Sequence, residues 1–165
     1  LNHILVNIES SIANYIGIKT MTSLSTGVLS YIALLFIGID SPIFWAFLIF
    51  LLNFIPTIGS IIATLFPAIF CLLQFGDLMP RLMALIFVGA IQLIIGNILE
   101  PKIMGNSLNI SPLVAITALL LWGAIWGITG MLLSIPITVI MVIIFAHFDN
   151  TKPLAIMLSE KGSIK

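Results

Sequence analysis

Polar residues suited to binding chemistry lie inside long apolar stretches of this sequence. They are uncharged amides and hydroxyls: Asn53, Thr57, Gln92, Asn97 and Thr129. In lipid a polar group needs a partner, so each of these residues is a candidate for a binding site or a transport path. Amides, hydroxyls and free backbone ends suit a neutral, hydroxyl-rich solute or a partly dehydrated ion. The alternative interpretation is that they cap a break in a helix or join two helices.

Charged candidates meet where one apolar stretch ends. Glu100 and Lys102 flank Pro101, and they predict either a gate with an ion pair at the mouth of a path or a helix stop at the lipid headgroups. The chain has 2 His and 1 Cys, and no Ser/His/Asp set falls within one membrane face. This inventory favours neither a catalytic triad nor a metal cluster. We therefore expect no enzyme activity, no metal and no cofactor.

The composition places these candidates in a membrane protein. Of the 165 residues, 61% are hydrophobic and 7% are charged, with a formal net charge of zero, and the mean hydropathy is +1.28. A soluble domain carries about 25% charge, so the main solvent of this chain must be lipid. Disordered, disulfide-rich and nucleic-acid-binding classes are excluded. We expect an all-α, polytopic helical membrane protein, and because the first residue is Leu1 we expect a piece of a longer protein.

The spacing of charges predicts the membrane-spanning elements. Residues 20–39 and 82–99 each match the ~20 residues that cross a hydrocarbon layer about 30 Å thick. The neutral stretches that follow them are too long for one crossing, and they contain Pro and Gly. We therefore predict two broken helical hairpins, over 42–76 and 111–147. Ser-Pro at 41–42 and at 111–112 is typical of a helix start.

Prolines and glycines predict where the hairpins turn. Pro56 and Gly59 mark the first break, and Gly127 and Gly130 mark the second. We expect positive φ angles at Gly59 and Gly130. The two hairpins have similar spacings between their breakers, so each follows a spanning helix as one copy of a duplicated unit.

The predicted domain map has a terminal helix, two transmembrane units and a tail. Residues 1–19 form an amphipathic interfacial helix, and the units cover 20–76 and 77–148, the second with a loop over 100–110. Residues 149–165 form a cytoplasmic tail. The positive-inside rule puts most basic residues in the cytoplasm when Lys19 lies there. The two units then have inverted orientations, as in many secondary transporters.

Hydroxyl residues form a stripe on the first spanning helix. Thr22, Thr26 and Ser30 recur every four residues. We interpret this stripe as a helix-packing surface rather than the lining of a path.

A set of motifs accompanies the two breaks and the charged helix end. In chain order they are Asn53-Phe-Ile-Pro-Thr-Ile-Gly59, Gly96-Asn-Ile-Leu-Glu-Pro-Lys-Ile-Met-Gly105, Ser111-Pro112, Gly127-Ile-Thr-Gly-Met131 and Ser134-Ile-Pro136. Their combination resembles the autoinducer-2 exporter family of bacterial permeases. The matching motif residues are Asn53, Pro56, Gly59, Asn97, Glu100, Pro101, Gly105, Pro112, Gly130 and Pro136. The resemblance implies an inner-membrane transporter of which this chain is the C-terminal half.

The resemblance also implies a choice of cargo. Some members are associated with export of autoinducer-2, a small neutral polyhydroxylated quorum-sensing signal, and others are described as sodium/proton antiporters. Many members carry Glu immediately before the Gly96-Asn97 motif, where this chain has Ile95. This difference removes the most natural proton carrier and favours export.

Three functional hypotheses follow. The first is a secondary-type exporter of small polar molecules, with its site between the two breaks. Its substrate-binding residues are Asn53, Pro56, Thr57, Gly59, Gln92, Asn97, Thr129 and Gly130, and Glu100, Pro101 and Lys102 form its gate. The second is an ion antiporter with Glu100 as the carrier. The third is a non-transporting membrane scaffold. We also expect a homo-oligomer.

Overall fold

The chain folds into helices, as shown by a computed structural model that describes residues 2–104, 110–148 and 151–159. Gly105, part of the predicted loop over 100–110 and much of the tail lie outside the described residues. The helices form two compact units, one over residues 18–103 and one over residues 1–17 with 104–165. Each unit is described by itself below.

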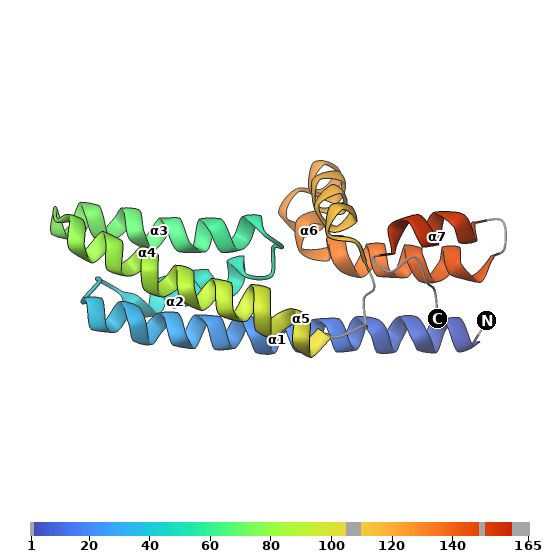
Figure 1. The fold of residues 1–165 in the computed structure, drawn as a ribbon, viewed down its shortest axis with the longest axis horizontal. Helices are drawn as coiled ribbons and strands as arrows, with labels where there is room; N and C mark the ends of the chain where they lie inside the picture. The colour runs from blue at the N-terminus through green and yellow to red at the C-terminus, as the bar shows by residue number, and fades with distance from the viewer. Residues whose placement is uncertain (1, 105–109, 149–150, 160–165) are drawn as a thin grey trace. The chain divides into compact units, whose positions relative to one another are not determined.

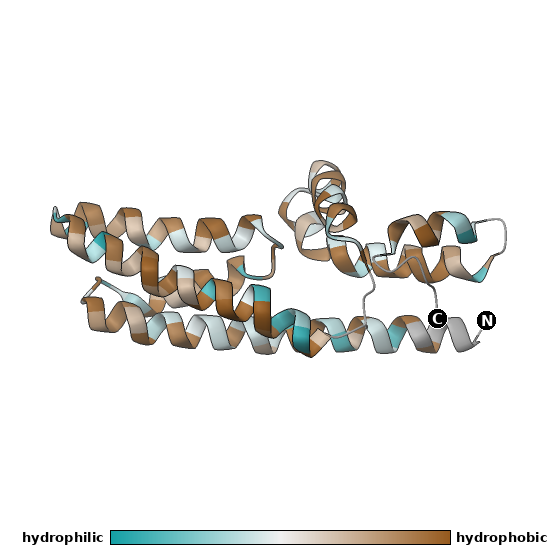
Figure 2. Ribbon diagram, in the orientation of Figure 1, coloured by the Kyte–Doolittle hydropathy of each residue, from teal (hydrophilic) through white to brown (hydrophobic). Residues whose placement is uncertain are grey.

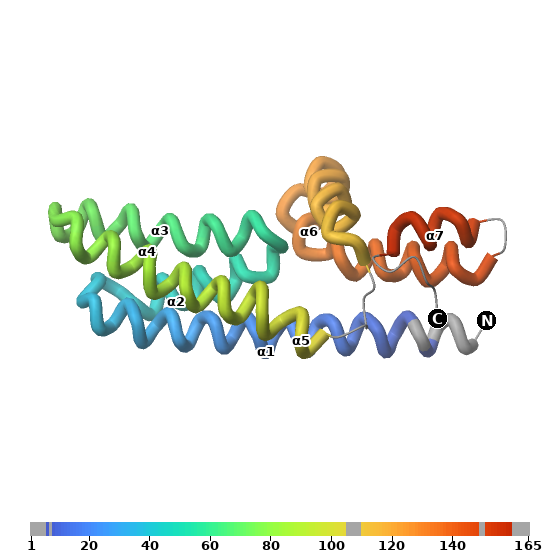
Figure 3. The backbone as a smooth tube through the Cα atoms, in the orientation of Figure 1, coloured from blue at the N-terminus to red at the C-terminus, as the bar shows by residue number. Residues whose placement is uncertain are grey.

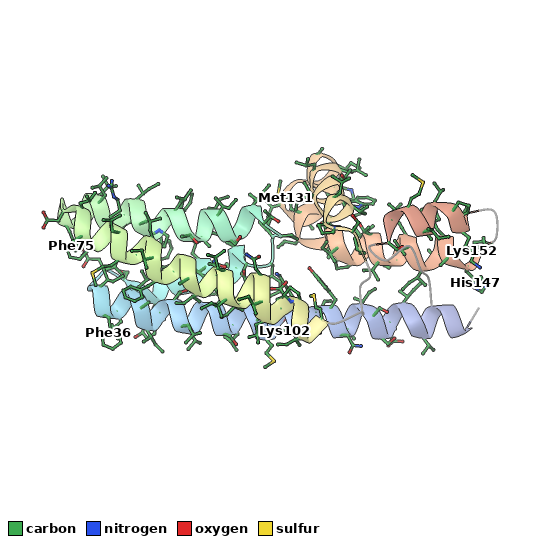
Figure 4. The ribbon with its side chains drawn as sticks, in the orientation of Figure 1. Phe36, Phe75, Lys102, Met131, His147 and Lys152 are labelled. Atoms are coloured by element: carbon green, nitrogen blue, oxygen red, sulfur yellow. The ribbon has the colours of Figure 1, made fainter. Side chains whose placement is uncertain are left out.

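Four helical segments are long and apolar enough to cross a membrane. They are Ile8–Ile37, Ile58–Phe75, Leu78–Met104 and Pro112–His147. Many large apolar side chains lie on the outside; Phe36, for example, is 87% exposed and points away from the helices (Figure 4). Figure 2 shows apolar residues along most helical surfaces. An apolar outer surface is the one that lipid solvates, and it confirms the prediction of an all-α, polytopic membrane protein.

The first helix is longer than one crossing requires. α1 runs without interruption over Asn2–Ile37, which is 36 residues and about 54 Å at 1.5 Å per residue. It includes both the predicted interfacial segment and the predicted spanning segment. Lys19 therefore lies within a continuous helix rather than at a boundary between two.

The unit of residues 18–103 contains a helical hairpin beside α1. α2 (Pro42–Leu52) and α3 (Ile58–Phe75) pack against each other, and α4 (Leu78–Gln92) packs along α3 (Figure 1). The end of α3 lies beside the end of α1. Gln74 accepts a hydrogen bond from the Asp40 N–H at 2.8 Å and donates to the Gly38 carbonyl at 3.2 Å. Residues 42–76 therefore return to the end of α1 from which they left.

Small and branched side chains fill the centre of this unit. The buried cluster comprises Leu34, Ile39, Ile49, Ala63, Ala68, Cys71, Ala84 and Val88. Gly27 lets α1 and α2 come close, because a Cβ there would lie 3.2 Å from both the Ala46 carbonyl oxygen and the Phe50 Cβ. Close approach through small residues is the usual way in which helices pack in lipid.

The α4 helix continues through an unusual segment. A π-helix, η1 (Leu93–Leu99), follows α4 and leads into the short helix α5 (Glu100–Met104). The Glu100 N–H donates to the Ile95 carbonyl, five residues earlier. Pro101 has no N–H and clashes with the turn before it in regular α-helical geometry, and the wider π turn relieves that clash.

The other unit is built on α6 and α7. α6 (Pro112–His147) packs against α7 (Lys152–Leu158), and the buried residues Tyr15, Ile135 and Val139 form its core. α2 and α6 begin at Pro42 and Pro112, as the Ser-Pro pairs predict. Within the described chain, however, neither preceding serine makes a capping side-chain hydrogen bond.

α6 is interrupted near its middle. Gly127 has φ 61° and ψ −140°, which is non-helical, and the backbone changes direction within α6 in Figure 3. The side chain of Met131 comes back toward Gly123, since a Cβ on Gly123 would lie 3.0 Å from it. The break falls within the segment 126–130 where the sequence predicts one.

Candidate functional site

A row of buried polar residues runs along α1 in the unit of residues 18–103. Lys19, Thr22, Ser23, Thr26 and Ser30 are each at most 6% exposed. Their spacing of three and four residues puts them on one face of the helix. Asn53 and Glu100, from other elements, bond this row, and Gln92 is a further buried polar residue of the same unit. We call these eight residues together the polar track.

A buried ion pair closes one end of the polar track. The Lys19 ammonium lies 2.6 Å from Glu100 Oε1, and the two side chains are 7% and 14% exposed. Thr22 contacts the other carboxylate oxygen, with its Oγ1 3.3 Å from Glu100 Oε2 and 3.2 Å from the Lys19 carbonyl. A buried charge is expensive unless it is paired, and here each charge has its partner.

This pair differs from the predicted gate. Glu100, Pro101 and Lys102 were predicted to form the gate together, but Pro101 and Lys102 are exposed and the cation that Glu100 contacts is Lys19. The reason is geometric: successive residues of a helix point about 100° apart, so Lys102 is carried off the side that Glu100 presents to α1. Figure 2 shows hydrophilic residues gathered where η1 and α5 meet.

The first hairpin break places Asn53 against α1. Asn53 is 5% exposed, and its Nδ2 lies 3.2 Å from the Ser23 Oγ. Its backbone N–H also bonds the Ile49 carbonyl at the end of α2. Asn53 therefore links the break to the polar track, whereas Thr57, on the other side of the break, is exposed.

Steric fit explains the glycines at both breaks. Neither Gly59 nor Gly130 has a positive φ, so that expectation is wrong. Instead, a Cβ on Gly59 would overlap the Leu52 carbonyl, and a Cβ on Gly130 would overlap the Trp122 carbonyl. The residue with a positive φ stands two or three positions earlier in each break: Thr57 with φ 58° and Gly127 with φ 61°.

Gln92 lies inside the unit without a partner. It is 6% exposed, and neither its amide nitrogen nor its amide oxygen makes a hydrogen bond to any described residue; the same holds for the Ser30 hydroxyl oxygen. α4 runs antiparallel to α1 (Figure 1). Counting from the Lys19–Glu100 pair, Gln92 lies eight residues before Glu100, across η1, and Ser30 lies eleven residues after Lys19 along α1, so both groups lie on the same side of that pair.

These groups would be stabilised by any water or polar ligand that reached them. A buried amide or hydroxyl without a hydrogen bond costs about 1–3 kcal/mol, and a water or solute hydroxyl that bonds it recovers part of that cost. Among the described residues no group of three His, Cys, Asp or Glu side chains could hold a metal ion. The polar track thus offers amides and hydroxyls, with its charges paired at one end.

The structure separates the predicted site residues. Those within residues 18–103 are Asn53, Pro56, Thr57, Gly59, Gln92, Asn97, Glu100, Pro101 and Lys102. Asn53, Gly59 and Gln92 are buried there, whereas Thr57 and Asn97 are exposed. The other unit holds Pro112, Gly127, Thr129, Gly130 and Pro136, of which Gly130 and Pro136 are buried and Thr129 is exposed.

Sequence reasoning missed part of the track. It treated Lys19 as a cytoplasmic flank; its interpretation of the hydroxyl stripe as a helix-packing surface stays a prediction. The regular four-residue spacing of Thr22, Thr26 and Ser30, extended backwards toward Lys19, was the signal that could have identified a polar face.

Comparison with known proteins agrees with this architecture. Residues 1–150 match the family described as AI-2E family transporter. A relative from Borreliella burgdorferi is 44% identical over 155 residues, covering 93% of this chain and 43% of its own length. The AI-2 transport protein TqsA of Escherichia coli (strain K12) is 37% identical over 150 residues, covering 91% of this chain and 43% of its own length. The chain thus spans less than half the length of these relatives. This is a family of transport proteins rather than enzymes, and the chain belongs to it.

Proposed function

We propose that the protein is a secondary-type exporter of small, polar, uncharged molecules, and that the polar track lines its path. Membership of the AI-2E family supports transport. The name of TqsA, an AI-2 transport protein, makes autoinducer-2 the first solute to test. The amides and hydroxyls of the track match the hydroxyl groups of such a solute.

One observation carries this proposal: the Gln92 amide is buried with neither of its polar atoms bonded to a described residue. A residue kept only for packing would be more stable as Leu, since burial of an unpartnered amide is costly. A solute or water that passes and bonds the Gln92 amide would recover part of that cost.

The other predicted residues have distinct roles in this proposal. Asn53 binds solute beside Ser23, while Pro56, Thr57 and Gly59 hold the break that positions Asn53. Glu100 closes the end of the path. The exposed residues Asn97 and Thr129 are the weakest members of the set, and their role depends on parts of the transporter that pack against them.

The proposed location and orientation of the protein rest on its family and on the positions of its charged residues. We propose the bacterial inner membrane, with the end of the unit that holds Lys19 and Glu100 facing the cytoplasm. The ion pair supports this orientation, because both residues were assigned to the cytoplasmic side by the positive-inside rule. The C-terminus then also lies in the cytoplasm. The homo-oligomer and the inverted repeat remain predictions.

Replacement of Gln92 by Leu tests the proposal. In liposomes containing the purified protein, Gln92→Leu should reduce autoinducer-2 flux to background, while the thermal midpoint in detergent stays the same or rises. Leu93→Ala is the matched control, since Leu93 is the next residue on the same helix and is 60% exposed; its flux should match the unmodified protein. Full autoinducer-2 flux in Gln92→Leu would show that Gln92 does not bind the solute, and it would contradict the proposed path.

Ion antiport is the second candidate, because Glu100 is a carboxylate enclosed within the helices. It predicts proton-coupled sodium exchange that disappears in Glu100→Gln. Sodium exchange that persists in this variant would exclude Glu100 as the carrier.

A further inference from the structure

Lys19 occupies an unusual place among the charges of the unit of residues 18–103. It is 6% exposed, and the Glu100 side chain that it contacts is 14% exposed. The remaining charged side chains of that unit are exposed or half-buried: Asp40, Asp77, Arg81 and Lys102. Lys19 and Glu100 are therefore the charges that a molecule inside the unit would meet.

The two oxygens of the Glu100 carboxylate both face donors from α1. The Lys19 ammonium occupies Oε1 at 2.6 Å, and the Thr22 hydroxyl lies 3.3 Å from Oε2. Both donors belong to this chain, so the carboxylate offers no free charge to a passing ion. The rest of the polar track contains hydroxyls and amides only, from Ser23, Thr26, Ser30, Asn53 and Gln92.

We infer that Lys19 determines the charge selectivity of the path: its ammonium fills the position on Glu100 that a monovalent cation would otherwise take. This inference rests on the proposed function, since it assigns a specificity residue to the same path. Carboxylates that face a pore favour cations, and a carboxylate that loses its partner inside lipid takes up a proton or another cation. With Lys19 in place, the path is restricted to neutral solutes.

The decisive experiment removes the Lys19 charge alone and then removes the Lys19 and Glu100 charges together. Purified protein is reconstituted in liposomes, and uptake of radioactive Na⁺ and Rb⁺ is measured alongside autoinducer-2 flux. Lys19→Met should raise cation uptake by about tenfold or more, equivalent to about 1.4 kcal/mol in the barrier. Lys19→Met/Glu100→Gln should return cation uptake to the unmodified level, because the double variant has no carboxylate to attract a cation.

Two further variants separate charge from structural damage. Lys19→Arg keeps the positive charge and should keep cations out. Lys152→Met removes an exposed lysine that lies in no predicted site and should leave cation uptake unchanged. If Lys19→Met cannot be purified in a folded state, Lys19→Gln replaces it, and the exchange Lys19→Glu/Glu100→Lys, which keeps one charge of each sign, should exclude cations.

The outcomes distinguish this inference from the proposed function. If Lys19→Met admits no more cation than the unmodified protein, or if the double variant leaks as much as Lys19→Met, the inference is wrong. If the unmodified protein moves no autoinducer-2, the proposed substrate fails, yet the contrast in cation uptake between the single and double variants still decides the role of Lys19.

Discussion

Two buried amides of the polar track have different surroundings. Asn53 donates to the Ser23 hydroxyl at 3.2 Å, so its burial is partly compensated. Gln92 has no such bond to a described residue. In lipid, one interhelical hydrogen bond contributes only about 0.6 kcal/mol on average, so a variant at Asn53 should lose little stability. Any large effect at Asn53 would then have to come from function.

Replacement of Asn53 tests that difference at the residue scale. Asn53→Leu should abolish autoinducer-2 flux in liposomes while the protein still reaches the membrane, because an apolar side chain replaces the amide beside the path. Ser23→Ala should only weaken flux, since Asn53 remains. Ser25→Ala is the control: its hydroxyl bonds the Met21 carbonyl of its own helix at 2.9 Å, so flux should be unchanged. Normal flux in Asn53→Leu would reject Asn53 as a site residue.

Lys19 shows what single-residue reasoning from sequence could and could not predict. A lysine between polar and apolar segments is typical of a membrane boundary, and its partner, Glu100, lies 81 residues away in sequence. Such a pairing depends on tertiary packing, which residue type and spacing do not specify. The amides of the track, by contrast, could be identified as candidates because polar residues are so rare in these stretches.

At the scale of elements, the two breaks share two features. In each, a residue with a positive φ, Thr57 or Gly127, is followed by a glycine that fits against an earlier backbone carbonyl. The sequence predicted the positions of these breaks because Pro and Gly disfavour helix. It gave the wrong reason for Gly59 and Gly130, since the need for close approach depends on the folded backbone.

Alanine substitution tests that steric role. Gly59→Ala and Gly130→Ala should each destabilise the protein by about 1–3 kcal/mol, because the added methyl group overlaps backbone that must move. Thermal unfolding in detergent measures the change. Gly17→Ala is the control, since its Cβ would meet no atom within 4 Å and Ala favours helix. Midpoints at or above that of the unmodified protein for both test variants would contradict the steric explanation.

The π-helix Leu93–Leu99 was outside the reach of sequence reasoning. Its residues read as ordinary apolar helix, and periodicity does not separate an α turn from one wider turn. The segment matters because the extra residue in a π turn rotates everything that follows. Glu100 comes directly after it, so the π register helps to determine which side of the helix the carboxylate occupies.

At the scale of the whole molecule, the alternation of crossings decides which ends face which side. Residues 42–76 return to the end of α1 where they began, as the bonds of Gln74 to Asp40 and Gly38 require. Charge spacing predicted this return because a single crossing there would reverse the location of every later lysine.

Cysteine accessibility in whole cells tests this topology. After Cys71→Ala, single cysteines at Ser41 and Asp77 should react with a membrane-impermeant maleimide from outside. A cysteine at Thr151 should react only after the membrane is opened, because the second segment is also predicted to return to its starting side. Cys71 itself is buried, so a protein retaining it should label weakly and serves as the background. Labelling of Thr151→Cys in intact cells, or labelling of Ser41→Cys and Asp77→Cys from opposite sides, would show that one of the two long segments crosses the membrane once. Either result would invalidate the proposed orientation of the path.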